Sequence, residues 1–149
     1  MEFALAQTTS VELDKQASFI TNFSNHLENY FLKKDYGKDL KSIIIGINCV
    51  SPNFEQFFKI QKPKYIGNKK VSISKYTGQS YEIEKCLSYD LKLDFETFKN
   101  ISEIEAKKYL SEEILKSIDI IGTMQKKIKD FDLLMFKKDL SSYFKEFYF

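Results

Sequence analysis

Five carboxylates lie in phase along one alternating segment, and their type and spacing could support chemistry. They occupy even positions between residues 82 and 96, namely Glu82, Glu84, Asp90, Asp94 and Glu96. Neighbours two residues apart on a strand share a face and lie about 6.8 Å apart, so two of them could hold one divalent cation. One hypothesis is therefore a divalent-metal-dependent enzyme that uses Asp90, Lys92 and Asp94. The alternatives for this face are a solvated strand surface and a surface that docks a protein.

Lysines and aromatic residues gather in the segment that leads into these carboxylates. Residues 57–85 carry seven lysines and two acids, a net charge of +5, and include Lys69, Lys70 and Tyr76. Lysine and aromatic side chains on strands bind single-stranded nucleic acid through charge and stacking, so such a binding module is the alternative function. The whole chain has a formal charge of only +2 and contains no Arg, the residue that recognises phosphate and guanine with paired hydrogen bonds. These counts disfavour nucleic acid as the partner.

The other residues that could carry chemistry are few. His26 is the only histidine, and no G-x-S-x-G nucleophile motif accompanies it. Cys49 and Cys86 are too few for a disulfide scaffold or a four-cysteine zinc site; we expect Cys49 to be buried and Cys86 to share the polar face with the carboxylates. The sequence contains no glycine-rich phosphate loop, HExxH motif or EF-hand loop. We therefore assign no catalytic residue, metal or cofactor, and expect a protein that is not an enzyme.

Hydrophobic periodicity predicts the strands that position these residues. Between residues 81 and 95 every odd position is apolar except Lys85, which predicts one long antiparallel strand with a solvated polar face. Residues 43–50 are apolar on both faces, as expected of a central strand. Two further strands are expected within residues 57–66 and 71–76, because turn residues follow each of them. Short turns between successive strands predict an antiparallel meander.

Helical periodicity flanks the four predicted strands. One helix is expected to reach about residue 30, and a second to follow residue 102. Each has a pair of residues with capping-box spacing at its start, in which each side chain can bond the backbone amide of the other residue. These pairs are Thr9 with Glu12 and Ser102 with Glu105.

The expected fold class is α+β, with an N-terminal helix, a four-stranded antiparallel meander and two C-terminal helices packed on one face of the sheet. The last helix is expected to begin after Asp130 or Asp132. We expect a single domain over residues 1–149, with residues 1–10 as a flexible start. The first residues lack a secretory leader and no apolar stretch reaches about 18 residues, which predicts a cytoplasmic protein without a membrane partner.

Three of these features occur together between about Leu40 and Phe144. They are the apolar strand at residues 43–50, the lysine-rich hairpin, and the segment YDLKLDFETF at residues 89–98, which leads into the C-terminal helices. In this combination the chain resembles small bacterial immunity proteins that accompany polymorphic or contact-dependent toxins. The resemblance implies a cytoplasmic, non-enzymatic protein that binds a cognate toxin domain and blocks it.

The leading hypothesis is therefore a stoichiometric inhibitor with a preformed surface that buries about 800 Å² on each partner. The first surface expected to contact the toxin is the acidic strand face, which consists of Glu82, Glu84, Asp90, Asp94 and Glu96. The second is the lysine hairpin, represented by Lys69, Lys70 and Tyr76. The oligomeric state stays open.

Overall fold

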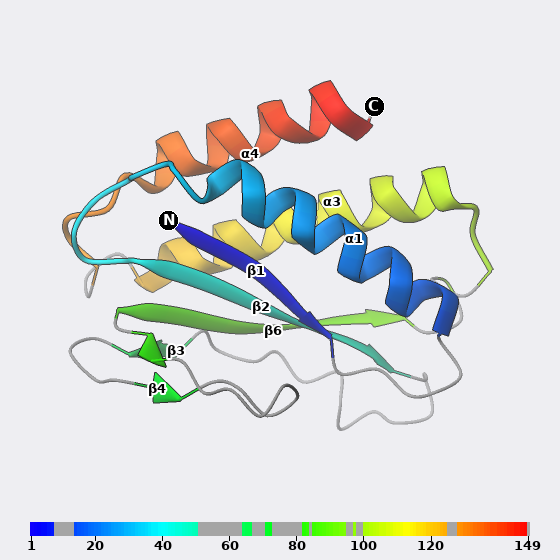
Figure 1. Cartoon of the computed structure of the whole chain (residues 1–149), viewed down its shortest axis with the longest axis horizontal. Helices are drawn as coiled ribbons and strands as arrows, with labels where there is room; N and C mark the ends of the chain where they lie inside the picture. Colours follow the sequence, from blue (N-terminus) through cyan, green and yellow to red (C-terminus); the bar gives the residue numbers. More distant parts are fainter. Residues whose placement is uncertain are drawn as a thin grey trace.

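The structure is a computed structural model that describes residues 1–7, 14–50, 64–66, 71–72, 82–83, 85–94, 97, 100–124 and 128–148. Its elements, labelled in Figure 1, are β1 (Glu2–Gln7), α1 (Asp14–Phe31), β2 (Ser42–Val50), β3 (Lys64–Ile66), β4 (Val71–Ser72), β5 (Glu82–Ile83), β6 (Cys86–Asp94), α3 (Glu103–Ile121), a 3₁₀ turn (Gly122–Met124) and α4 (Leu133–Tyr148). None of the helices in these ranges is long and apolar enough to cross a membrane.

The main sheet has the strand order β1-β2-β6-β3. Its three long strands are parallel: β1 pairs with β2, and β2 pairs with β6 along its whole length. The short strand β3 joins the far edge and runs antiparallel to β6, while β4 and β5 form a separate antiparallel pair. The predicted four-stranded antiparallel meander is therefore wrong, although the protein does combine helices with a sheet.

The error has a physical reason. A period of two identifies a half-buried strand but carries no information about the direction of its neighbours. Strand β1, at residues for which we expected a flexible start, takes the edge position beside β2, and helix α1 then provides the crossover that parallel pairing requires. Residues 2–7 offer only Phe3 and Leu5 as large apolar residues in phase, so their strand is a weak sequence signal.

The predicted strand at residues 81–95 is interrupted at Lys85, its one odd position that is not apolar. Lys85 has a positive φ of 52°, which separates β5 from β6. Its carbonyl oxygen accepts a hydrogen bond from the Lys41 amide at 2.9 Å, and its Nζ donates to the Lys38 carbonyl oxygen at 3.0 Å. The bend therefore places Glu82 in a different sheet from Asp90, so the five carboxylates do not line one continuous strand.

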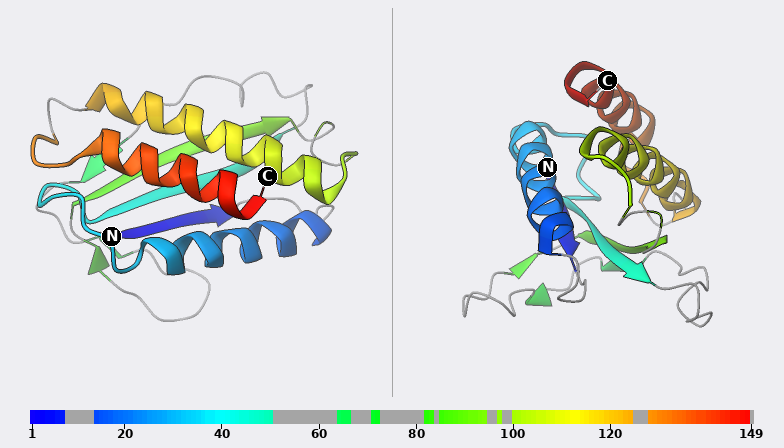
Figure 2. Two further views of the ribbon diagram at one scale, coloured as in Figure 1. Left: turned by 90° about the horizontal axis from the view of Figure 1, so that it is seen from above. Right: turned by 90° about the vertical axis from the view of Figure 1, so that its right-hand side faces the viewer.

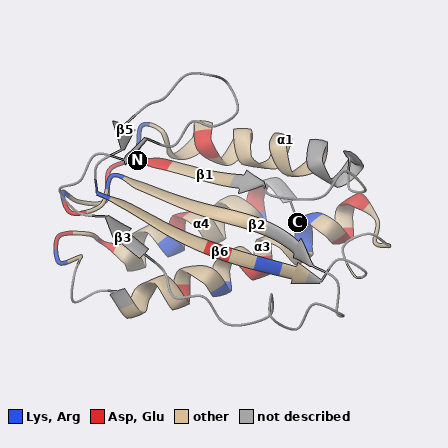
Figure 3. Ribbon diagram, turned by 90° about the horizontal axis from the view of Figure 1, so that it is seen from below, with Lys and Arg blue, Asp and Glu red and all other residues tan. Residues whose placement is uncertain are grey.

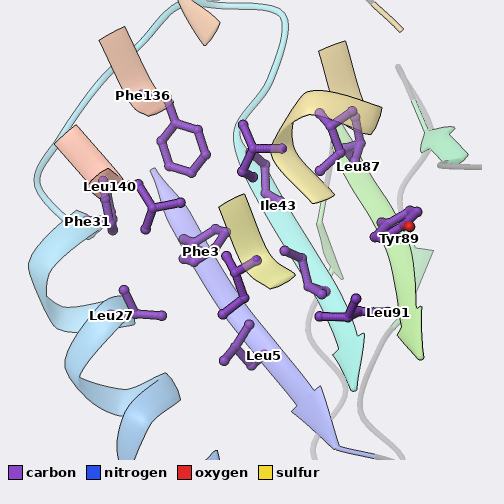
Figure 4. Close-up of a cluster of buried hydrophobic side chains, with 14 of the residues drawn as sticks. Phe3, Leu5, Leu27, Phe31, Ile43, Leu87, Tyr89, Leu91, Phe136 and Leu140 are labelled. Atoms are coloured by element: carbon purple, nitrogen blue, oxygen red, sulfur yellow. The ribbon is translucent and has the colours of Figure 1, made fainter. Parts of the chain in front are cut away.

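The three helices lie on one face of the sheet in two layers, as the end-on view in Figure 2 shows. Helices α1 and α3 cover β1 and β6, and α4 lies outermost over the pair. The core is formed where the apolar rows of the sheet meet these helices; in one row Phe3, Ile43 and Leu87 are register neighbours, and all three are fully buried. The outer helix still reaches this core, because the rings of Phe3 and Phe136 are 5.4 Å apart (Figure 4).

Local capping signals fix the starts of the C-terminal helices. The Ser102–Glu105 capping box is confirmed: the Glu105 amide donates to Ser102 Oγ at 3.3 Å, and the Ser102 amide donates to Glu105 Oε2 at 3.1 Å. Of the two candidates for the last helix, Asp132 is the cap, and its carboxylate accepts from the Met135 amide at 3.0 Å. The predicted Thr9–Glu12 pair lies outside the described residues.

Candidate partner-binding surfaces

Of the eight residues predicted to contact a partner, only Asp90 has a described side chain, and that side chain is exposed. Glu82 lies in β5 and Asp94 at the end of β6, but only their backbone positions are described. The remaining predicted residues, Glu84, Glu96, Lys69, Lys70 and Tyr76, lie outside the described parts of the chain. Asp90 is therefore the one residue of the predicted acidic strand face whose side-chain exposure the structure describes.

Asp90 alternates along β6 with the buried residues Tyr89 and Leu91, so it lies on the face of the sheet that points away from the helices. Figure 3 shows this face from below. The register partner of Asp90 there is Gly46: a Cβ added to Gly46 would lie only 2.7 Å from Asp90 Oδ1, so the carboxylate lies over the glycine of the adjacent strand. Lys92 is half-buried two residues further along β6. We call the surface formed by Gly46, Ser88, Asp90 and Lys92 the polar sheet face.

Cys86 corrects a prediction about this face. We expected it to be solvated beside the carboxylates, but it is buried at the start of β6 next to its register partner Ser42. Burial raises the pKa of the Cys86 thiol. Glu2 lies in the same row, where partial burial, followed by repulsion from Glu28, raises the pKa of its carboxyl group. Within the described residues, no three His, Cys, Asp or Glu side chains come together as a metal-ligand set.

The free edge of β1 is closed to strand addition at its centre. Ser24 of α1 is buried against β1, where its hydroxyl accepts from the Leu5 amide at 2.9 Å and donates to the Leu5 carbonyl oxygen at 3.3 Å. Covering an edge in this way prevents another chain from pairing with it. A partner strand would therefore find the backbone groups of Leu5 already occupied.

A second surface stands out on the helical side of the molecule. Four large apolar side chains of the described chain are exposed: Leu134 (79%), Ile104 (75%), Leu32 (58%) and Met135 (47%). Three of them lie where α1 ends and α4 begins, two ends that adjoin in Figure 1. Leu32 and Met135 flank Phe31 and Phe136, whose rings are 5.2 Å apart. We call Leu32, Leu134 and Met135 the helix-end patch.

A closely packed cluster of rings, which we call the aromatic base, joins the ends of α1 and α4 that carry the helix-end patch. Tyr36 packs on Phe136 with a ring separation of 5.4 Å and on Phe131 at 6.0 Å. Its hydroxyl donates to Asp139 Oδ2 at 2.6 Å. Burial, followed by this hydrogen bond and by the charge of Asp139, raises the pKa of Tyr36 well above its usual range. The phenol is therefore protonated at physiological pH and holds the end of α1 against α4.

Backbone contacts tie the adjacent loops together just below the patch. The Asp132 amide donates to the Tyr36 carbonyl oxygen at 2.7 Å, and the Asp39 amide donates to the Asp130 carbonyl oxygen at 3.1 Å. Asp39 Oδ2 accepts from the amides of Asp130 and Lys129 at 2.8 and 2.9 Å. We call this junction of residues 36–39 with residues 129–132 the loop junction. It fixes the end of α1 relative to the start of α4.

A family model for immunity protein 44 (Imm44) matches residues 1–146. The chain belongs to the Imm44 family. The match includes β1, which precedes the region that resembled immunity proteins in the sequence. Neither the curated proteins nor the solved structures that were compared contain a match to the chain.

The helix-end patch of this Imm44 protein was missed by the sequence analysis, although a signal for it exists. The apolar stripe that buries α4 contains Phe136, Leu140 and Phe144, at steps of four residues. Leu134 and Met135 fall outside this stripe, so on a helix they must face away from the core side. An apolar residue out of phase with a helical stripe therefore indicates an exposed position on that helix.

Proposed function

We propose that this Imm44 protein neutralises a cognate toxin domain by binding it stoichiometrically. The observation that carries the proposal is the family match over residues 1–146. We further propose that the toxin is a bacterial protein domain and that binding takes place in the cytoplasm, as the resemblance in the sequence implied. Neutralisation then follows from occupation of the toxin, because a bound toxin domain cannot engage its target.

The described structure supports a mechanism based on surface shape. Three helices stacked on a parallel sheet give a rigid body, and rigid surfaces lose little conformational entropy on binding. The loop junction and the aromatic base extend this rigidity to the exposed end of the helices. A preformed surface of this kind suits an inhibitor that must capture its target quickly and completely.

The acidic strand face is the alternative candidate for the contact with the toxin. Asp90 is exposed, as contact with a partner requires, and it could pair with a basic toxin residue. Because β5 and β6 belong to different sheets, this proposal now concerns Asp90 and its neighbours rather than a row of five carboxylates. A charge reversal at Asp90 tests it directly.

The proposed function is tested by co-expression in a bacterial host with the toxin domain encoded beside this chain in its source genome. Cells that produce the toxin domain alone should stop growing, and the wild-type chain should restore growth. Size-exclusion chromatography of the purified pair should give one complex with a fixed ratio of the two chains. Arrest of growth despite abundant folded chain, with two separate elution peaks, would contradict the proposal.

A further inference from the structure

We infer that the helix-end patch is the anchor of the toxin interface, and that it receives a toxin surface in which apolar side chains are bordered by carboxylates. This inference rests on the proposed function and adds the location of the interface and the chemistry of the partner. The patch consists of Leu32, Leu134 and Met135, exposed at the adjoining ends of α1 and α4.

The side chains of the patch are exposed to water. Large apolar side chains that stay in water lose the free energy that burial would provide, and clusters of them on a soluble protein mark interaction sites. Leu134 is the most exposed large apolar residue of the described chain, and Met135 adjoins it. Methionine adapts to irregular partner surfaces because its side chain is unbranched and polarizable.

Packed neighbours hold the backbone that carries the patch. Binding energy concentrates in a few well-supported residues near the centre of an interface. Phe136 follows Met135 directly and is fully buried between Phe31 and Phe3. The backbone that carries Leu134 and Met135 is therefore fixed by packed neighbours and does not need to reorganise when a partner arrives.

Two lysines place positive charge beside the patch. Lys33 and Lys138 are exposed beside the patch, and neither forms an ion pair in the described structure. Three acidic side chains near them are engaged: Asp139 contacts Tyr36 and Lys34, Asp132 caps α4, and Asp119 pairs with Lys137. Two further carboxylates, Asp35 and Asp130, are exposed in the adjacent loops.

The N-terminus of α4 carries partial positive charge, which the carboxylate of its cap, Asp132, offsets. The exposed positive charge beside the patch is therefore that of Lys33 and Lys138, and it favours a partner that supplies carboxylates next to its apolar centre.

The patch and the polar sheet face lie on opposite sides of the molecule, separated by the sheet and the helices (Figure 2). An interface of ordinary size covers about 800 Å² of one partner, so a single toxin domain has one of them at its centre. The polar sheet face offers a carboxylate and a half-buried lysine at its described positions, whereas the patch offers three large apolar side chains.

The test measures the affinity of the purified full chain for the toxin domain encoded beside it, by biolayer interferometry. The test variant carries Leu134→Ser and Met135→Ser. The matched control is Ile104→Ser, which removes an equally exposed apolar side chain at the start of α3. We expect the double variant to weaken the Kd by about 30-fold or more, as loss of an interface anchor does, and the control to stay within about twofold.

Unchanged thermal unfolding of both variants establishes that they fold, since all three side chains are exposed. A double variant that binds within about twofold of wild type overturns the inference, as does a control that loses as much affinity. A third outcome also overturns the inference: the wild-type chain is a dimer, the double variant is a monomer, and both bind the toxin domain equally well. The patch would then join two copies of the chain.

The chemistry of the partner is tested by charge reversal. Lys33→Glu with Lys138→Glu should slow association about tenfold at low salt, and the difference should shrink at high salt as the charges are screened. Lys108→Glu, an exposed reversal on α3, is the control and should leave the association rate near that of wild type. Faster association of the double reversal would show that the toxin surface is basic and would overturn the assignment of carboxylates.

Failure of the inference and failure of the proposed function give different results. If the wild-type chain neither binds nor protects against the toxin domain, the proposed function fails. If the wild-type chain binds and protects, but the patch variants do so equally well, only the location of the interface is wrong.

Discussion

The loop junction under the helix-end patch and the polar sheet face each contain a glycine in close contact, and the two contacts differ in kind. A Cβ added to Gly37 would lie 2.1 Å from the carbonyl oxygen of Asp130 and 2.8 Å from the Cα of Phe131, both backbone atoms. A Cβ added to Gly46 would meet the end of the Asp90 side chain at 2.7 Å. The first neighbour is fixed by the fold, and the second can rotate into solvent.

This difference shows how rigidity is distributed in the molecule. At the helix end, backbone contacts and a buried aromatic base fix the loops. At the polar sheet face the pairing of β2 with β6 fixes the backbone, and the close contact at Gly46 is made by the end of the Asp90 side chain. Rigid, well-supported surfaces lose less entropy when they bind. The helix end therefore presents apolar side chains on a fixed backbone, whereas the polar sheet face presents a carboxylate that loses rotational freedom when it binds. The predictions below test each side of this comparison.

The largest effect is expected from Gly37→Ala. Gly37 has a φ of 141°, a region essentially restricted to glycine, and its added Cβ would press on the backbone of the facing loop. The free energy of unfolding should fall by about 3 kcal/mol, measured by urea denaturation. Gly46→Ala is the matched control and should stay within about 1 kcal/mol of wild type, because the Asp90 side chain can move. Equal losses at the two glycines would remove the distinction between the regions.

A smaller effect is expected from Tyr36→Phe, which keeps the aromatic packing and removes the hydroxyl. The lost hydrogen bond to the Asp139 carboxylate should lower the free energy of unfolding by about 1.5 kcal/mol, since hydrogen bonds to charged groups are stronger than neutral ones. The affinity for the toxin domain should also fall, because Asp139 lies one helical turn after Met135. Wild-type stability and affinity in this variant would show that the hydroxyl does not support the patch.

Acid should weaken the loop junction through Asp39. Hydrogen bonds from the backbone amides of Asp130 and then Lys129 hold the pKa of Asp39 below its usual range. A lowered pKa in the folded state means that the carboxylate contributes stability above its unfolded pKa, about 3.9, and loses that contribution as the pH falls through the folded value. Thermal unfolding of wild type and Asp39→Asn should therefore differ near pH 7 and converge below about pH 4. A gap that is constant with pH would exclude this electrostatic role.

The smallest effect is expected from Asp90→Lys. With the anchor at the helix end, reversal of this exposed charge should change the affinity for the toxin domain by less than about twofold at physiological salt. The measurement uses the same toxin domain as the patch variants, so the two sides of the molecule are compared on one scale. A loss as large as that of the Leu134 and Met135 double variant would move the interface to the polar sheet face.

The helices could be predicted from the sequence because their signals are local. Ser102, Glu105 and Asp132 act within one turn of the residues they cap, so spacing alone identifies them. The core face of β6 was also predictable, since Leu87, Leu91 and Leu93 alternate with polar residues and are buried.

The sheet topology could not be predicted in the same way, because strand direction depends on partners distant in the sequence. Leu5 pairs with Ile45 and Ile45 with Tyr89, and no local pattern specifies that both pairs are parallel. The acidic strand face could not be predicted for a similar reason. Five carboxylates share one face only if residues 82–96 form an unbroken strand, and the bend at Lys85 interrupts that strand. The exposure of Leu134 and Met135 could be predicted from their phase relative to the stripe of α4, but that Leu32 lies at the adjoining end of α1 became clear only from the packing of the two helices.

The most direct test of the interface is a lysine acetylation footprint of the wild-type chain, alone and saturated with the toxin domain encoded beside it. Lys33 and Lys138 report on the helix-end patch, and Lys92 reports on the polar sheet face. We predict that the toxin domain strongly protects Lys33 and Lys138 and leaves the modification of Lys92 unchanged. Protection of Lys92, with Lys33 and Lys138 modified as in the free chain, would contradict the assignment of the toxin to the helix end.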